Sequence, residues 1–149
     1  MRETTYSKLS KAEKTLLDAA EKAIKYSYSP YSGFKVGAAL LTKHRQIIMA
    51  ANVENSSYPM AMCAEMAAVA KANSLGVRKF EAIAVISKSK NHKNEVIAPC
   101  GACRQILSEF SRLAGNNLKV IMSDQKKKKI VIANIHELQP MAFGHEHLR

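Results

Sequence analysis

Two short cysteine motifs constrain the fold of this chain more than any other feature. One is Cys63-Ala64-Glu65, and the other is Pro99-Cys100-Gly101-Ala102-Cys103. Each coincides with the predicted start of a helix, where free amide groups and the positive end of the helix dipole stabilise thiolates. Proline suits such a start because its missing N–H has no partner to lose there. If both helices begin at these motifs, the fold can bring three sulfur atoms together between two helix ends.

Three converging thiolates are typical of a catalytic metal site. Zinc prefers four ligands, so three protein ligands leave one position for water. Glu65 lies two residues after Cys63 and can face the metal without binding it, which suits it to proton transfer. The spacing therefore predicts one zinc ion per chain, bound by Cys63, Cys100 and Cys103.

A structural zinc site and a redox site are the alternative explanations of a Cys-x-x-Cys motif. A redox site would need neither the third cysteine nor Glu65. A structural site would need a fourth ligand, and no histidine has a short ligand spacing to Cys63. The candidate histidines are His92, His136, His145 and His147.

The hydrophobic pattern predicts helices that alternate with strands. Helices are predicted near residues 10–26, 63–74, 100–115 and 136–138, and strands near residues 34–41, 46–52, 81–87, 118–122 and 130–133. The first helix opens with Ser10-Lys11-Ala12-Glu13, which matches a capping box. The first two strands share a short turn and are expected to be antiparallel, whereas helical crossovers make the middle strands parallel. We expect a single domain, residues 1–149, with an α/β fold: a three-layer α/β/α sandwich around a mixed five-stranded sheet.

The formal net charge of +11 raises the question of a polyanionic partner. The one dense basic run, Lys126-Lys127-Lys128-Lys129, lies between two apolar segments. We interpret it as a solvated hairpin turn, with a phosphate-binding patch as the alternative. No apolar stretch is long enough to span a bilayer, and the N-terminus lacks a secretory signal. We therefore expect a cytoplasmic protein without a membrane partner, which also fits three clustered cysteines in a reducing compartment.

Several segments of the chain resemble one known family. The two cysteine motifs match the zinc deaminase signature, in which a glutamate moves protons. Over nearly the whole chain, the sequence resembles the short, homotetrameric cytidine deaminases. The further matching segments are Tyr28–Leu40, Asn52–Pro59 and Glu137–Gly144. The resemblance implies a cytidine deaminase-like fold, hydrolytic deamination of cytidine and 2′-deoxycytidine in pyrimidine salvage, and a homotetramer.

The resemblance also implies the residues that hold a nucleoside. Asn52 and Glu54 would hydrogen-bond the ribose 3′-hydroxyl, with Val53 between them among the substrate contacts. Phe34 would lie against the pyrimidine ring, although a core aromatic is the alternative. These positions predict a pocket for a free nucleoside rather than for a nucleic-acid chain, because a 3′-phosphate would meet a carboxylate.

Other implied contacts lie closer to the reacting atoms or at a subunit boundary. The backbone near Ser56 and Ala64 would meet the base and its amino group. Tyr58 would complete the pocket of its own or a neighbouring subunit, and Phe143 would reach a neighbour's site. Glu65 would take a proton from water and deliver protons to N3 of the base and to the leaving amine, so that uridine and ammonia form.

One position departs from the family pattern. Family members with three cysteines usually have arginine three residues after the first cysteine, and this chain has Met66. Zinc with three thiolates has a formal charge of −1, which the arginine offsets and methionine cannot. Helix N-terminal amides or Arg104 could take over this role. The substitution concerns catalytic efficiency more than fold or metal binding.

Three alternative functions follow from these observations. They are a deaminase of RNA or single-stranded DNA, a deaminase of another aminopyrimidine nucleoside, and a zinc-binding homologue of low activity because of Met66. The net charge favours the first, but the chain has almost no sequence beyond the compact core. A nucleic-acid partner is therefore not expected despite the charge of +11.

Overall fold

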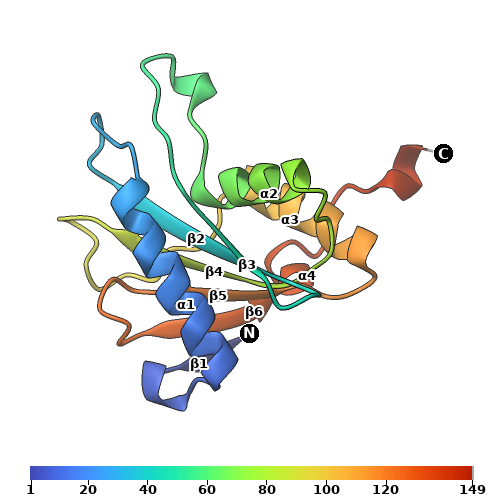
Figure 1. The fold of residues 1–149 in the computed structure, drawn as a ribbon, viewed down its shortest axis with the longest axis horizontal. Coiled ribbons are helices and arrows are strands. Elements are labelled where there is room, and N and C mark those ends of the chain that lie inside the picture. The colour runs from blue at the N-terminus through green and yellow to red at the C-terminus, as the bar shows by residue number, and fades with distance from the viewer. Residues whose placement is uncertain (149) are drawn as a thin grey trace.

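Six strands form one mixed sheet in the computed structural model, which describes residues 1–148 (Figure 1). The strands are β1 (Arg2–Thr4), β2 (Lys35–Thr42), β3 (Ile47–Ala51), β4 (Phe80–Lys88), β5 (Lys119–Ser123) and β6 (Ile130–Asn134). Their order across the sheet is β1-β6-β5-β4-β2-β3. Only β4 and β5 pair in parallel; the other neighbouring pairs are antiparallel. The mixed sheet, the antiparallel β2–β3 pair and the parallel pair across a helical crossover are thus confirmed.

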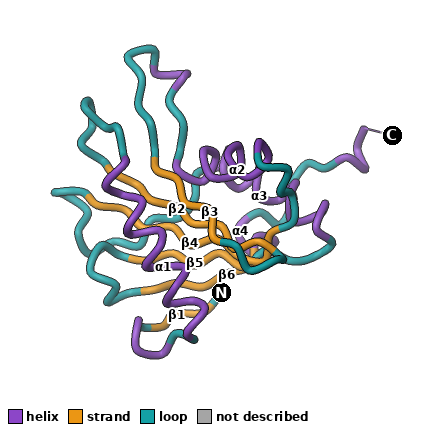
Figure 2. The backbone as a smooth tube through the Cα atoms, viewed as in Figure 1, coloured by secondary structure: helices purple, strands orange, loops and turns teal. Residues whose placement is uncertain are grey.

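Helices cover both faces of this sheet. They are α1 (Lys11–Ala23), α2 (Ala64–Ser74), α3 (Gly101–Ala114) and α4 (Ile135–Leu138). Figures 1 and 2 show α1 on one face, and α2 and α3 together on the other. Two separate apolar clusters fill the layers, one between α1 and the sheet and one beneath α2 and α3. This confirms the predicted three-layer α/β/α sandwich.

The sheet has one strand more than the five expected. Residues Arg2–Thr4 pair with β6 at the edge of the sheet, where Glu3 is the partner of Val131. Such an edge strand is held by backbone hydrogen bonds and buries little side-chain surface, so it needs no alternating apolar pattern. The polar sequence Arg2-Glu3-Thr4 therefore gave no strand signal.

The predicted capping box at the start of α1 is present. Glu13 N donates to Ser10 Oγ at 3.3 Å, and Ser10 N donates to Glu13 Oε2 at 2.9 Å. The helix packs close to β2 because residue 37 is glycine. A Cβ atom at Gly37 would collide with the carbonyl oxygen of Ala20 in α1. Gly37 thus sets the distance between the first helix and the sheet.

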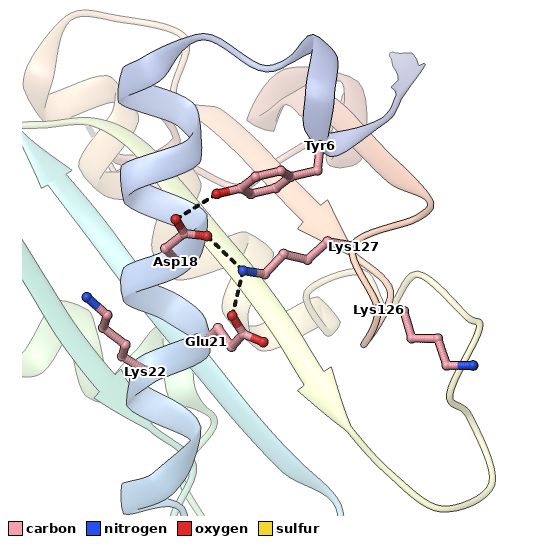
Figure 3. Close-up of a pocket in the computed structure, with 6 residues that line it drawn as sticks. All are labelled: Tyr6, Asp18, Glu21, Lys22, Lys126 and Lys127. Atoms are coloured by element: carbon pink, nitrogen blue, oxygen red, sulfur yellow. Dashed lines mark hydrogen bonds and ion pairs between the residues drawn. The ribbon is translucent and has the colours of Figure 1, made fainter.

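The lysine run forms the β5–β6 turn, as predicted, but one of its lysines is not solvated. Lys127 has a positive φ of 56°, and its side chain is only 17% exposed. Its Nζ lies 2.7 Å from Asp18 Oδ1 and also pairs with Glu21, both on α1 (Figure 3). Tyr6 completes the cluster by donating its hydroxyl hydrogen to Asp18 Oδ2 at 2.7 Å. Lys127 therefore ties the hairpin turn to α1.

Within residues 1–148, no helix is both long enough and apolar enough to cross a membrane.

Candidate active site and metal centre

Two of the three cysteines are the N-cap residues of neighbouring helices. Cys63 caps α2 with an extended backbone, and its carbonyl accepts from Ala67 N at 3.0 Å. Cys100 caps α3 in the same way, with its carbonyl 2.9 Å from Arg104 N. Neither sulfur caps its own helix with a hydrogen bond. Both sulfurs therefore remain available at helix ends whose dipoles favour negative charge.

The three sulfur atoms converge as the spacing predicted. Sγ atoms of Cys63, Cys100 and Cys103 all lie within 4.8 Å of one another, and those of Cys63 and Cys100 are 3.9 Å apart. A tetrahedral zinc ion with Zn–S bonds of about 2.3 Å requires sulfur atoms about 3.8 Å apart. Small side-chain movements suffice to reach this geometry, so the three cysteines fit one zinc ion.

The thiol groups of the cluster alter one another's pKa through hydrogen bonds. Hydrogen bonding from Cys103 is the largest influence on Cys63 and lowers the pKa of its thiol to about 6. The same hydrogen bond, together with burial, raises the pKa of Cys103. One sulfur thus takes negative charge while a neighbour keeps a proton. A zinc ion needs deprotonated sulfur ligands, so its binding displaces the remaining protons.

Glu65 lies beside this cluster on the first turn of α2. The residue is only 5% exposed. Burial, reinforced by the nearby Cys63, raises the pKa of its carboxyl group to about 6. A carboxyl group in such a setting can both accept and release a proton near neutral pH. Its position two residues from a metal ligand is the one expected from the sequence.

A cavity of about 290 Å³ opens onto the cysteine cluster and Glu65. Its volume is close to the lower end of the range for small-molecule sites, about 300–1,000 Å³. Seven of the predicted site residues line it: Phe34, Asn52, Val53, Glu54, Cys63, Glu65 and Cys100. The fold therefore gathers residues from β2, the segment after β3, α2 and α3 around one small space.

Asn52 uses its amide group to join the segments around this cavity. Its Oδ1 accepts from Ser27 Oγ at 2.6 Å and from Val36 N at 2.8 Å. Its Nδ2 donates to the carbonyl oxygen of Phe34 at 2.9 Å. An amide nitrogen has two hydrogens, so one more donor is available for a ligand. Asn52 thus fixes the backbone that carries Phe34.

Glu54 holds a second loop at the cavity mouth. Its Oε2 accepts from the backbone N–H groups of Tyr31 and Ser32, at 2.9 and 3.2 Å, and its Oε1 accepts from the Ser32 hydroxyl. The Ser32 hydroxyl is the main reason that the pKa of Glu54 is lowered. Its carboxylate is therefore ionised at neutral pH and lines the cavity.

Four predicted contacts lie outside the lining of this cavity. Ser56 and Tyr58 are exposed on the segment that projects beyond α2 in Figure 1, and Ala64 is buried at the start of α2. Tyr58 instead lines an adjoining hollow with Tyr31 and Glu54. Phe143 stacks on His147 near the C-terminus, with ring centroids 5.2 Å apart. Cys103 is buried and, unlike Cys63 and Cys100, does not line the cavity.

The cavity also contains residues that the sequence did not single out. Met62, Val85, Ile97 and Ala98 add apolar surface next to the cysteines. Ile97 and Ala98 directly precede the Pro99-Cys100 motif, so their place in the sequence was a usable signal. Val85 gave no signal of its own, because it reads as one of many apolar residues in a buried strand.

Arg104 binds backbone carbonyl groups and does not replace the positive charge that is missing at Met66. Its Nε donates to the carbonyl oxygen of Pro99 at 2.8 Å, and its Nη1 donates to that of Leu138 at 3.2 Å. The side chain thereby links the start of α3 to the end of α4. Of the two proposed sources of positive charge, the helix N-terminal amides are the one that the geometry favours.

The chain is similar to known proteins over most of its length. The family model of the cytidine and deoxycytidylate deaminase zinc-binding region matches residues 10–114. A cytidine deaminase from Sporosarcina psychrophila is 40% identical over 133 residues, which cover 89% of this chain and 92% of that protein. One from Halalkalibacterium halodurans is 41% identical over 131 residues, covering 88% and 93%. The crystal structure of a cytidine deaminase from Burkholderia pseudomallei is similar with a TM-score of 0.77 and 39% identity, covering 87% and 97%.

Proposed function

Because this chain belongs to the cytidine and deoxycytidylate deaminase family, we propose that it catalyses the zinc-dependent hydrolytic deamination of cytidine to uridine, with release of ammonia. One observation carries the proposal. Three sulfur atoms within 4.8 Å of one another lie beside a buried carboxyl group, and both border the same small cavity. A structural zinc site would require neither the carboxyl group nor the cavity.

Cys63, Cys100 and Cys103 hold one zinc ion per chain in this proposal. When bound, zinc acts as a Lewis acid and lowers the pKa of a water molecule to about 7. The first turns of α2 and α3 contribute free N–H groups that balance the negative charge of the thiolates. The cavity borders Cys63 and Cys100, so water and substrate would approach the cysteine cluster from the cavity.

Glu65 transfers the protons. Its carboxylate accepts a proton from the attacking water and delivers a proton to N3 of the base, so that water oxygen bonds to C4. A further proton passes through Glu65 to the amino group, which leaves as ammonia. Cytidine and one water thus give uridine and ammonia, and Glu65 returns to its starting state. Its raised pKa of about 6 suits this alternation.

The nucleoside lies between Phe34, which contacts the pyrimidine, and the Asn52–Glu54 segment, which holds the sugar. Val53 contributes to the same wall. Asn52 and Glu54 act on the 3′-hydroxyl, a group common to ribose and deoxyribose, so 2′-deoxycytidine is a substrate too. Such a reaction returns free nucleosides to the pyrimidine pool, which is a salvage role.

Ser56 and Ala64 meet the base through their backbone groups, Tyr58 completes the pocket of its own or a neighbouring subunit, and Phe143 reaches a neighbour's site. We infer a homotetramer for this reason. Large apolar side chains are exposed where partners would pack: Tyr58 at 75%, Met60 at 66% and Phe143 at 55%. Packing of these side chains against partner subunits would remove their apolar surface from water. Light scattering after gel filtration should give four times the mass of the 16.4 kDa chain.

The sheet and the cysteine cluster also support proposals about the domain organisation of the chain and its cellular compartment. One sheet with both faces covered supports a single domain, residues 1–149. Three free cysteines that must remain thiolates for zinc support a reducing compartment, which we take to be the cytoplasm.

The direct test is conversion of free cytidine. The zinc-loaded protein should convert cytidine to uridine and 2′-deoxycytidine to 2′-deoxyuridine, and each conversion should release one ammonia per nucleoside. A cytosine-containing oligonucleotide of matched concentration should give no uracil. Protein with full zinc content that converts neither nucleoside would overturn the proposal, and efficient conversion of the oligonucleotide would support a polymer deaminase instead.

A further inference from the structure

A second, larger groove lies at the other side of β4 from the catalytic cavity. Its volume is about 680 Å³, and Ile24 and Ile86, both buried, lie at its base. Ile86 faces α1, whereas its neighbour Val85 lines the catalytic cavity. Since successive residues of a strand point to opposite faces, the two hollows are separated by the sheet.

Five lysines line this basic groove: Lys25, Lys35, Lys88, Lys90 and Lys93. They come from the 3-10 turn Ile24–Tyr26 after α1, the start of β2, and the end of β4 with the loop after it. Figure 1 shows these segments gathered at one end of the molecule, next to the β5–β6 turn. Lysines far apart in the sequence thus face one space.

The positive charge of the basic groove is not neutralised within the described chain. Glu21 is the one acidic residue in its lining, and its carboxylate already pairs with Lys127 (Figure 3). None of the five lysines forms an ion pair within residues 1–148. By contrast, the groove beside β1 has two glutamates, Glu3 and Glu95, among three lysines.

The register of the sheet adds an independent observation. Lys35 and Lys88 are direct partners in the antiparallel β2–β4 pair. Like charges directly opposite each other destabilise a sheet. The fold therefore retains a repulsive pair at the centre of the basic groove, which a bound anion would relieve.

We propose that the basic groove binds single-stranded nucleic acid through its phosphates, independently of the catalytic cavity. The lysines are exposed, and their flexible ammonium groups suit successive phosphates rather than a single fixed ligand. Tyr26, which follows Lys25 in the chain, is 66% exposed; the Lys25 ammonium lies 4.8 Å from its ring centroid, and the ring is an aromatic surface on which a base can stack. Binding of this kind is independent of sequence and requires no deamination of the bound strand.

The test is fluorescence anisotropy with a labelled 20-residue oligouridylate, which contains no cytosine and so cannot be a substrate. Binding should weaken between 50 and 200 mM NaCl, with a slope of log K against log [salt] of about −3.5 for five lysine–phosphate contacts. The groove variant is Lys88→Gln, Lys90→Gln and Lys93→Gln together. It should bind at least about tenfold more weakly, with a slope shallower by about 2.

A matched control separates local from overall charge. Lys8→Gln, Lys11→Gln and Lys79→Gln together remove the same charge at the opposite ends of α1 and β4. This variant should change affinity less than about threefold. Equal weakening by both variants would show that only net charge matters and would overturn the proposal, as would absence of binding by the wild-type protein.

Two further arms identify the ligand and check the fold. Uridine triphosphate that binds as tightly as the oligonucleotide, or phosphatidylserine vesicles that bind in its place, would contradict a nucleic-acid groove.

Thermal unfolding of Lys88→Gln should occur at a temperature no lower than that of the wild type, because the repulsion with Lys35 is removed. If the triple variant unfolds at a lower temperature, Lys90→Gln alone should still reduce the salt slope, and an unchanged slope would refute the proposal.

Discussion

The sulfur atoms of Cys63 and Cys100 lie 3.9 Å apart, although the two residues cap different helices. The parallel strands β4 and β5 are connected through α3, and α2 precedes β4, so both helices lie on one face of the sheet with their N-termini adjacent. This arrangement places each thiolate at the positive end of a helix dipole. The metal site is thus a consequence of how the sheet is connected.

Loss of one ligand should abolish stoichiometric zinc binding. We expect about one zinc per wild-type chain and less than a tenth of that in Cys100→Ala, because two sulfur ligands cannot complete the site. Elemental analysis of freshly purified, unchelated protein measures this. Glu65→Gln is the matched control and should keep its zinc. Full zinc retention by Cys100→Ala would contradict the ligand assignment.

A 3′-phosphate should exclude a substrate from the pocket. Glu54 is ionised because the Ser32 hydroxyl and two backbone N–H groups hold its pKa low. A phosphate beside this carboxylate is repelled, so kcat/KM for cytidine should exceed that for cytidine 3′-monophosphate by at least about 10². Glu54→Gln should narrow this ratio. Comparable values for the two substrates in the wild-type enzyme would argue against the role of Glu54.

Replacement of Met66 by arginine should accelerate turnover. Met66 is the third residue of α2, one turn after Cys63, and methionine offers that sulfur no hydrogen-bond donor. A charge-assisted hydrogen bond contributes about 1.5–3 kcal/mol. If part of this energy stabilises the transition state more than the bound substrate, kcat should rise at least about threefold. The comparison requires equal zinc content, with Met66→Leu as the control. An unchanged kcat would mean that the helix amides already supply enough positive charge.

The ion pairs of Lys127 should stabilise the fold at neutral pH and not in acid. Although burial opposes it, hydrogen bonds from Lys127 and Tyr6 hold the pKa of Asp18 below its usual value. A carboxyl group with a lowered pKa in the folded state stabilises above its unfolded pKa of about 4 and loses this contribution as the pH falls through the folded value.

Urea unfolding measures this effect. Lys127→Gln should lower the free energy of unfolding by about 1 kcal/mol at pH 7, a value reduced for the partial exposure of both carboxylates. The difference should shrink toward zero as the pH falls from 5 to 2. Lys126→Gln, in the same turn but exposed, should have little effect at any pH. A difference that persists in acid would assign Lys127 a role in the turn backbone instead.

Much of the fold could be predicted because its signals are local. The capping box at Ser10 and the apolar runs of β4 and β5 depend on residues close in the sequence, and these elements form as expected. β1 could not be predicted, because its pairing with β6 uses backbone groups that every residue has. Likewise, nothing in the lysine run distinguishes Lys127, whose partners Asp18 and Glu21 lie on α1.

The candidate site likewise has features that the sequence predicts and features that depend on the folded chain. The convergence of Cys63, Cys100 and Cys103 followed from motif spacing and helix starts. The protein contacts of Asn52 did not, because they join β2, the loop before it and the segment after β3. The basic groove could not be predicted for a related reason. Its lysines are scattered along the chain, and only the sheet brings Lys35 beside Lys88.

The role of Glu65 is the claim on which the whole account depends. Glu65→Gln preserves size but cannot carry protons, so zinc content and thermal stability should match the wild type. General acid–base catalysis contributes about 10²–10⁴ per step, and kcat for uridine formation from cytidine should fall by at least about 10². The measurement is ammonia release with zinc content determined on the same sample. A zinc-loaded Glu65→Gln variant that keeps more than about a tenth of wild-type kcat would contradict the account.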